Sequence, residues 1–172
     1  NHVTLGDPIY LGCAIPGRQL HYMAKAELFK NKLFGGFLKG VGAFPIARGT
    51  GGAEGIQTAI RLLKEEKVVC MFPEGTRSKT GEPLNPKTGV AMLAYKTQCT
   101  IVPVVIIGEG GKPPKIFKRM VINIGKPIPF EALGLTEESN MLYRRVSREV
   151  FEQVKALRAE SLDILENRWK SV

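Results

Sequence analysis

The stretch Phe72-Pro73-Glu74-Gly75-Thr76-Arg77-Ser78 follows an apolar run at residues 68–72. β-Branched and aromatic residues in such a run predict a buried strand, which Pro73 ends. In α/β proteins, ligands bind beyond the carboxyl ends of strands. Glycine lets a ligand approach the backbone, and the Thr, Arg and Ser that follow offer donors suited to phosphate or carboxylate. The stretch predicts either an anion site or an ordinary strand exit with a solvated arginine.

The composition of the chain indicates that its partners are anionic, but it does not identify which anionic partner binds. The chain has 172 residues, 44% of them hydrophobic, which is enough for one domain with a sizeable core. Its 25 Lys and Arg against 16 Asp and Glu give a net charge of +9. This balance favours nucleic acid, an anionic lipid surface, an acidic protein or a phosphorylated substrate. No apolar run approaches the ~18–20 residues that span a bilayer.

The three cysteines are odd in number and far apart, which predicts reduced residues in a domain that faces the cytosol. No spacing of Cys or His indicates a metal site.

Short apolar segments alternate with amphipathic ones, which is typical of α/β proteins with a largely parallel sheet. Asn85 before Pro86 predicts a helix start, Thr136 predicts the N-cap of a long final helix over 136–169, and Gly35-Gly36 predicts a weak point in a helix. We expect residues 1–172 to form a single α/β domain with a mostly parallel mixed sheet flanked by helices. Strands are predicted at residues 19–24, 68–72, 101–107 and 120–124, and helices at 27–39, 53–66, 86–97 and 137–169.

The predicted helix at residues 27–39 is both basic and amphipathic. It carries leucines and phenylalanines among three lysines. This pattern fits a helix that faces the core, or one that lies on an anionic membrane or lines an acyl-chain groove.

His2 and Asp7 are five residues apart at the start of the chain. On a continuous helix, this offset separates two side chains by about 140° around the axis. A turn, which Gly6 permits, would instead bring the carboxylate onto an imidazole nitrogen. That contact would fix the tautomer of the imidazole and stabilise the imidazolium formed when it takes a proton. The spacing alone is weak, because it arises often by chance and a histidine at a chain start is commonly solvated.

Several enzyme classes have signatures that this sequence lacks. It contains no Gly-x-Ser-x-Gly elbow, Walker A loop, His-Glu-x-x-His or complete Gly-x-Gly-x-x-Gly. A His–Asp dyad without a protein nucleophile suits activation of a hydroxyl that belongs to the substrate. Two loops with glycine and arginine, at residues 42–49 and 72–78, suit a substrate that also carries a phosphate.

These blocks together resemble the 1-acylglycerol-3-phosphate O-acyltransferase family of glycerolipid acyltransferases. The resemblance covers residues 1 to about 130 and extends to flanking positions at residues 25–28 and 87–89. Members of this family usually have a strand and membrane-associating helices before the first block, so we expect such a segment upstream of this chain. The four blocks occur in the family's order: His2/Asp7, Gly42 to Arg48, Phe72 to Ser78, and Ile101-Val102-Pro103-Val104.

The resemblance implies a reaction and a set of site residues. An acyl thioester, from coenzyme A or acyl carrier protein, would acylate the free hydroxyl of 1-acylglycerol 3-phosphate to make phosphatidic acid, with no metal or cofactor. His2 would be the base and Asp7 would orient it. Val102 and Pro103 would line the acyl chain or serve the fold. The substrate-binding residues implied are Lys25, Arg48, Glu74, Gly75, Thr76 and Arg77.

The same resemblance places the enzyme at the cytoplasmic face of a membrane with an anionic surface. Two alternatives stay open. The acceptor could be another lysolipid or glycerol 3-phosphate. In a different class altogether, the chain could be a non-catalytic basic domain that binds membrane or nucleic acid.

Overall fold

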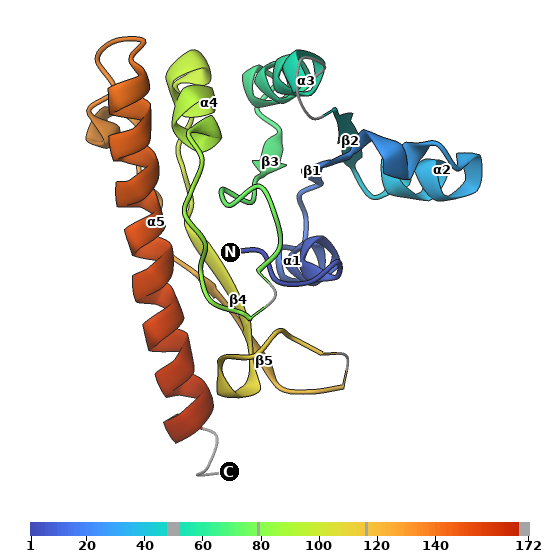
Figure 1. Cartoon of the computed structure of the whole chain (residues 1–172), viewed down its shortest axis with the longest axis vertical. Helices are drawn as coiled ribbons and strands as arrows, with labels where there is room; N and C mark the ends of the chain where they lie inside the picture. The colour runs from blue at the N-terminus through green and yellow to red at the C-terminus, as the bar shows by residue number, and fades with distance from the viewer. Residues whose placement is uncertain (48–51, 79, 116, 169–172) are drawn as a thin grey trace. The chain divides into compact units, whose positions relative to one another are not determined.

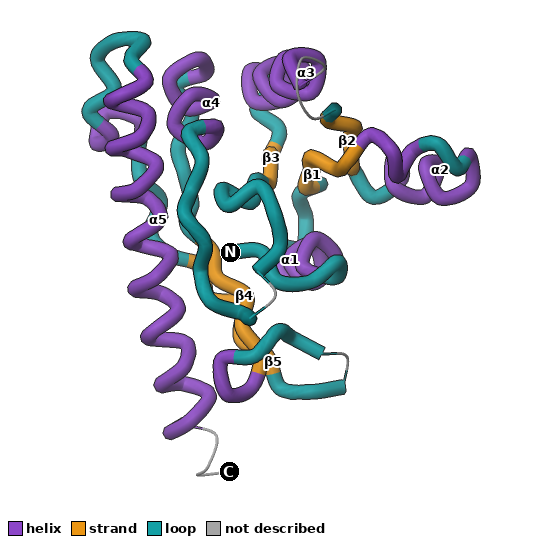
Figure 2. Tube along the Cα trace, in the orientation of Figure 1, coloured by secondary structure: helices purple, strands orange, loops and turns teal. Residues whose placement is uncertain are grey.

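The computed structural model of the chain describes residues 1–47, 52–78, 80–115 and 117–168. These residues form two compact units, one made of Asn1–Ala14 with the described part of Phe72–Val172, and one made of Ile15–Met71. The second unit holds a three-stranded parallel sheet and the first a two-stranded antiparallel sheet (Figure 2). The predicted α/β class with mostly parallel pairing is confirmed, although the described strands lie in two sheets rather than in one.

In the unit Ile15–Met71, β1 (Leu20–Lys25) lies between β2 (Ala43–Ile46) and β3 (Val68–Cys70), parallel to both. Leu20 and Tyr22, two residues apart in β1, are buried, as expected for a strand with one face on a core. The strand predicted at residues 68–72 ends two residues earlier than expected, at Cys70.

Helix α3 (Gly52–Lys64) connects β2 to β3 and supplies the crossover that parallel strands require. Its buried positions are Gly55, Ala59 and Leu62, which recur with the helical period. A methyl group added to Gly55 would lie 2.8 Å from Cγ1 of Ile46, so this glycine allows the helix to pack closely on β2.

The helix predicted at residues 27–39 is two elements, the 3₁₀ helix η1 (Ala26–Phe29) and the α-helix α2 (Lys32–Gly40). The break falls where Asn31 caps α2, its side chain accepting a hydrogen bond of 3.0 Å from the backbone N–H of Phe34. Gly35 and Gly36 both lie within α2, so the helix is not broken at this pair. A methyl group on Gly35 would lie 2.9 Å from the carbonyl oxygen of Phe29, so this glycine lets η1 pack on α2 instead of interrupting the helix.

In the other unit, the long helix α5 runs beside α4 and the β4–β5 pair (Figure 1). One core cluster joins α4 to α5 and includes Ala91, Ala94, Tyr143 and Val146. A second cluster, centred on Phe151, joins α5 to β4. The elements of this unit are α1 (Asp7–Ala14), α4 (Gly89–Thr97), β4 (Val104–Gly108), η3 (Glu109–Gly111), β5 (Met120–Ile124), η4 (Phe130–Leu133), α5 (Asn140–Asp163) and η5 (Ile164–Arg168).

Two predicted helix starts in this unit are wrong. Helix α4 begins at Gly89 rather than at Pro86, because the preceding backbone is bound elsewhere: the N–H of Lys87 donates to the carbonyl of Pro73 at 2.8 Å. Helix α5 begins at Asn140 rather than at residue 137. Its N-cap Ser139 has extended backbone (φ −138°, ψ 126°), which a helical residue cannot have.

Candidate active site

The structure brings together the side chains of His2 and Asp7, with 2.9 Å between Nδ1 of His2 and Oδ2 of Asp7. Asp7 is the first residue of α1, and His2 lies in the segment before that helix. The turn of chain between them, rather than a helical offset, makes the contact possible. A carboxylate in the first turn of a helix is also favoured by the positive end of the helix dipole.

Asp7 is fully buried, and both of its oxygens are hydrogen-bonded. Oδ2 accepts from the backbone N–H groups of Val3, at 2.7 Å, and Thr4, at 2.9 Å, as well as from His2. Oδ1 accepts from the hydroxyl of Thr4 at 2.5 Å. Burial by itself raises the pKa of Asp7, but the hydrogen bonds from His2 and Thr4 outweigh it and leave the pKa below its ordinary value. The carboxylate is therefore ionised at neutral pH.

An ionised Asp7 determines the tautomer of His2. A carboxylate only accepts hydrogen bonds, so Nδ1 of His2 carries a proton, and in the neutral imidazole the lone pair is then on Nε2. Among the residues that the structure describes, none forms a hydrogen bond with Nε2. The His2 side chain keeps 19% of its surface exposed, which leaves this base open to a substrate.

Three residues of the 72–78 stretch hold His2 in place. Its ring stacks on the ring of Phe72, with 4.0 Å between centroids and 22° between planes. Its backbone N–H donates to Oε1 of Glu74, and its carbonyl accepts from the N–H of Ser78, both at 2.8 Å. The stretch thus fixes the ring plane and both backbone groups of the residue that carries the base.

Asn1, the residue before His2, is also fixed to a sheet. The side-chain amide of Asn1 donates to the carbonyl of Ile106 at 2.9 Å and accepts from its N–H at 2.8 Å. These two hydrogen bonds hold Asn1 against β4, much as backbone hydrogen bonds from a neighbouring strand would. Sequence reasoning missed Asn1, Thr4, Phe72 and Ser78 as supports of the dyad; their only signal is that they lie beside or within the His2/Asp7 and Phe72–Ser78 blocks.

Glu74 is 3% exposed, and its two carboxylate oxygens both accept backbone hydrogen bonds. Oε1 binds the N–H of His2, and Oε2 binds the N–H of Leu84 at 2.8 Å. The carboxylate therefore joins the dyad segment to the loop before α4. This geometry favours a positioning role for Glu74, in addition to the substrate contact that the sequence predicted.

Replacing Glu74 by glutamine should reduce both stability and turnover. An amide can accept one of the two hydrogen bonds with its oxygen, but its NH₂ group would face the other backbone N–H. We expect the free energy of unfolding to fall by about 1–3 kcal/mol and kcat to fall by roughly tenfold or more, because His2 loses its backbone anchor. Chemical denaturation and steady-state kinetics check this. Glu131→Gln, at an exposed carboxylate, is the matched control and should change neither.

The other predicted site residues are distributed over the chain. Gly75, in the left-handed region with φ +65°, Thr76 and Arg77 are exposed beside Glu74. Lys25 ends β1 in the other unit and forms an ion pair of 3.1 Å with Glu27. Arg48 lies outside the described residues. The structure therefore joins His2, Asp7 and residues 74–77 in one unit and gives no geometry that links them to Lys25.

Val102 and Pro103 precede β4 and differ in burial. Val102 is 45% exposed. Pro103 is buried, and its carbonyl accepts the N–H of Gly125 at 2.8 Å, which extends the β4–β5 pairing. Pro103 thus has a structural role, whereas Val102 is available for a contact outside the fold.

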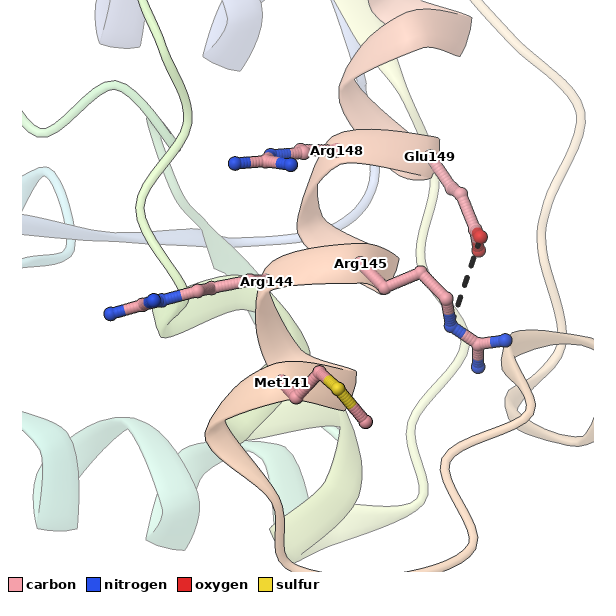
Figure 3. Close-up of a pocket in the computed structure, with 5 residues that line it drawn as sticks. All are labelled: Met141, Arg144, Arg145, Arg148 and Glu149. Atoms are coloured by element: carbon pink, nitrogen blue, oxygen red, sulfur yellow. Dashed lines mark ion pairs between the residues drawn. The ribbon is translucent and has the colours of Figure 1, made fainter.

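A hollow of about 490 Å³ lies on α5, apart from these residues. Figure 3 shows Arg144 and Arg148 extending to one side of the helix, while Arg145 and Glu149 form an ion pair of 3.8 Å on the other. Neither residue of the dyad lines this hollow, and neither does any of residues 74–77. Its lining is mostly exposed arginines around Met141, and its one carboxylate, Glu149, is paired with Arg145. We therefore assign the chemistry to the His2–Asp7 site.

A histidine base held by a buried carboxylate, on an α/β fold, is an arrangement used by enzymes that remove a proton from a hydroxyl group or water. The chain belongs to the acyltransferase family, since the family model described as Acyltransferase matches residues 1–107, more than half of its length.

Relatives within this family carry more specific names. The chain is 43% identical over 125 residues to the 1-acyl-sn-glycerol-3-phosphate acyltransferase of Bacillus subtilis (strain 168), covering 71% of this chain and 61% of that protein. It is 36% identical over 129 residues to the enzyme of the same name from Streptococcus pneumoniae, covering 74% and 47%. The chain thus spans about half to three-fifths of the length of these curated relatives.

A solved structure supports the fold. The crystal structure of the 1-acyl-sn-glycerophosphate (LPA) acyltransferase PlsC from Thermotoga maritima matches with a TM-score of 0.62 and 25% identity. The match covers 92% of this chain and 64% of that one. The predicted resemblance to the glycerolipid acyltransferases and their fold is confirmed.

Proposed function

We propose that the protein transfers an acyl group from an acyl thioester to the free hydroxyl of 1-acylglycerol 3-phosphate, forming phosphatidic acid. The observation that carries this proposal is the 2.9 Å contact between His2 and a buried, ionised Asp7, which leaves Nε2 as an exposed base. The printed names of the relatives support the choice of acceptor. The dyad also favours an enzyme over a non-catalytic basic domain, which would have no use for a histidine held in one tautomer.

The chemistry follows from the tautomer of His2. Nε2 takes the proton of the acceptor hydroxyl as its oxygen attacks the thioester carbonyl carbon, and the carbonyl oxygen becomes an oxyanion. Asp7 stabilises the imidazolium formed at this point. When the tetrahedral intermediate collapses, the C–S bond breaks and the proton on Nε2 passes to the leaving sulfur. No covalent acyl-enzyme and no cofactor is needed, because the substrate supplies the nucleophile and the thioester supplies the activated acyl group.

The acceptor's phosphate needs cationic partners, and we assign this role to Arg77, with Arg48 and Lys25. Arg77 is exposed and, in the part of the chain that the structure describes, forms no ion pair. Its planar guanidinium can bind two phosphate oxygens at once. Thr76, next to it, can offer its backbone N–H and its hydroxyl to the phosphate or to the thioester oxyanion. The N–H of Gly75 already donates to the carbonyl of Phe72 at 3.0 Å, so the contribution of Gly75 is close approach of a ligand to the backbone.

An acyl-transfer assay of the full-length protein tests this proposal. Acyl-coenzyme A and acyl carrier protein thioesters would each be offered with 1-acylglycerol 3-phosphate, glycerol 3-phosphate and lysophosphatidylcholine. We expect the highest kcat/KM with 1-acylglycerol 3-phosphate. Preference for another acceptor would correct the substrate, and no turnover with any pair would favour the basic binding domain.

The proposed acceptor and product are lipids, so the site must work at a membrane surface. None of the described helices is both long and apolar enough to cross a bilayer. Helix α2, however, exposes a set of large apolar side chains, with Leu33 88% and Phe37 55% exposed. Phe34 lies beside Phe37, with 6.3 Å between ring centroids. Three lysines flank these side chains, at positions 30, 32 and 39. This combination supports docking of α2 onto an anionic lipid surface.

We expect this chain to bind vesicles that contain phosphatidylglycerol and to dissociate as salt rises, because each basic residue near an anionic surface contributes only about 1 kcal/mol and is screened. The double variant Leu33→Ser/Phe37→Ser should weaken binding by roughly tenfold or more, since apolar area no longer enters the interface. Vesicle sedimentation measures both effects.

Met141→Ser is the control for vesicle binding, because Met141 is 75% exposed on α5 and should not contribute. Equal binding of neutral and anionic vesicles at every salt concentration would contradict the electrostatic part of this prediction. Unchanged binding of the double variant would show that another surface makes the contact.

A further inference from the structure

Lys87 has no role in the site described so far, yet its side chain reaches the Phe72–Ser78 stretch. A methyl group added to Gly75 would lie 3.0 Å from Cδ and Cε of Lys87 and 3.1 Å from its Nζ. The end of the lysine side chain therefore lies across the backbone of Gly75, at the residue with left-handed φ. The hydrogen bond from the N–H of Lys87 to the carbonyl of Pro73 fixes the lysine's own backbone to the same stretch.

The ammonium group of Lys87 is not neutralised within the described chain. It takes part in none of the ion pairs between described residues, whereas Lys96 pairs with Glu138 at 2.9 Å. The carboxylate next to Gly75 in the sequence, Glu74, uses its two oxygens for the N–H groups of His2 and Leu84. An exposed positive charge held over a turn without a carboxylate partner indicates a place for an anion.

Further donors lie on the same turn. Among the described residues, no hydrogen-bond partner is present for the backbone N–H of Thr76 or for that of Arg77, or for the Arg77 guanidinium. These groups and the Lys87 ammonium all belong to, or lie against, residues 75–77. Such a set of cationic and N–H donors is suited to a phosphate, which offers several acceptor oxygens and carries about −1.5 to −2 charges as a monoester.

We propose that Lys87 binds the phosphate of the acceptor together with Arg77. This inference rests on the proposed function. The acceptor's free hydroxyl and its phosphate are on adjacent carbons of one glycerol unit, so the phosphate must bind close to the base. Glu74 fixes the backbone of His2 and adjoins Gly75, which places Lys87 on the segment that supports the base. The phosphates of a coenzyme A donor, by contrast, lie at the far end of the pantetheine arm from the reacting carbonyl.

The test compares Lys87→Met with Lys87→Arg in the full-length enzyme. Lys87→Met should raise KM for 1-acylglycerol 3-phosphate about tenfold, with kcat changed less than about threefold and KM for the thioester unchanged. Lys87→Arg should restore most of the affinity, because it keeps the charge. Inhibition by glycerol 3-phosphate should weaken in parallel in Lys87→Met. Lys126→Met, at an exposed lysine after β5, is the matched control and should behave as wild type.

Three outcomes would overturn the inference: an unchanged KM for the acceptor in Lys87→Met, an equal rise in KM for the thioester, or an equal effect of Lys126→Met. Thermal unfolding of each variant separates loss of fold from loss of binding, and Lys87→Gln provides a second neutral variant should the methionine destabilise the turn. Failure of the proposed function would be visible separately, since wild-type enzyme would then not acylate 1-acylglycerol 3-phosphate at all.

Discussion

Replacing His2 by alanine should lower kcat by at least about 10²-fold, and up to about 10⁴-fold, in the full-length enzyme, because the proton of the acceptor hydroxyl then has no acceptor within the site. KM for both substrates should change little. The variant also loses the stacking of the imidazole on Phe72, so a modest fall in stability is expected as well. Steady-state kinetics and thermal unfolding, measured on the same preparation, separate the two effects.

The chain offers a matched control for this experiment. His21 is the second of its two histidines and lies half-buried in β1, in the other unit. His21→Ala should leave kcat within about threefold of wild type, because the proposed proton transfer uses His2 and Asp7 and not this imidazole. If acyl transfer by His2→Ala continued near the wild-type rate, His2 could not be the base.

Changing Asp7 to asparagine should lower kcat by roughly 10²-fold or more. The amide oxygen can replace Oδ2 as acceptor for the N–H groups of Val3 and Thr4, so the loop can keep its shape. The amide is neutral, however, and cannot stabilise an imidazolium on His2 as a carboxylate does. Its NH₂ group would also face the hydroxyl of Thr4, which donates to Oδ1 in the wild type and would have to rotate to accept.

The pKa of Asp7 gives this prediction a second measurement. Its folded pKa lies below the ordinary value of 3.8, so the ionised carboxylate stabilises the fold at higher pH and this contribution is lost as pH falls through the folded pKa. The stability difference between wild type and Asp7→Asn should therefore be largest near neutral pH and shrink in strong acid. Asp163→Asn, the only other aspartate of the chain and an exposed one, should show no such dependence. A kcat for Asp7→Asn close to that of wild type would contradict the dyad.

The sequence alone determined those features that depend on neighbouring residues. Periodicity of apolar residues located strands β1, β4 and β5 and helix α3 to within about three residues, because one face of each element is buried and the pattern repeats within a few positions. The ordered motif blocks indicated the acyltransferase family and the dyad. The spacing of His2 and Asp7 allowed their contact without requiring it.

Tertiary structure decided the features for which a local sequence signal competes with hydrogen bonds or packing contacts to distant residues. Asn85-Pro86 is a good local helix start, but the N–H of Leu84 is bound by Glu74 and that of Lys87 by Pro73, so α4 begins later. Gly35 marks close packing on Phe29, which no local rule can separate from a helix break.

The residues that hold His2 in place could not be predicted from the sequence either. Its backbone N–H is bound by a carboxylate 72 positions away, and which residues meet across such a distance depends on the path of the whole chain. Likewise, an amphipathic pattern shows that α2 has an apolar face, but only packing decides whether this face meets a core, and in the structure Leu33 and Phe37 remain exposed. The sequence therefore indicated which residues take part in the proposed reaction. The fold supplied the hydrogen bonds that hold the base, His2, in one orientation.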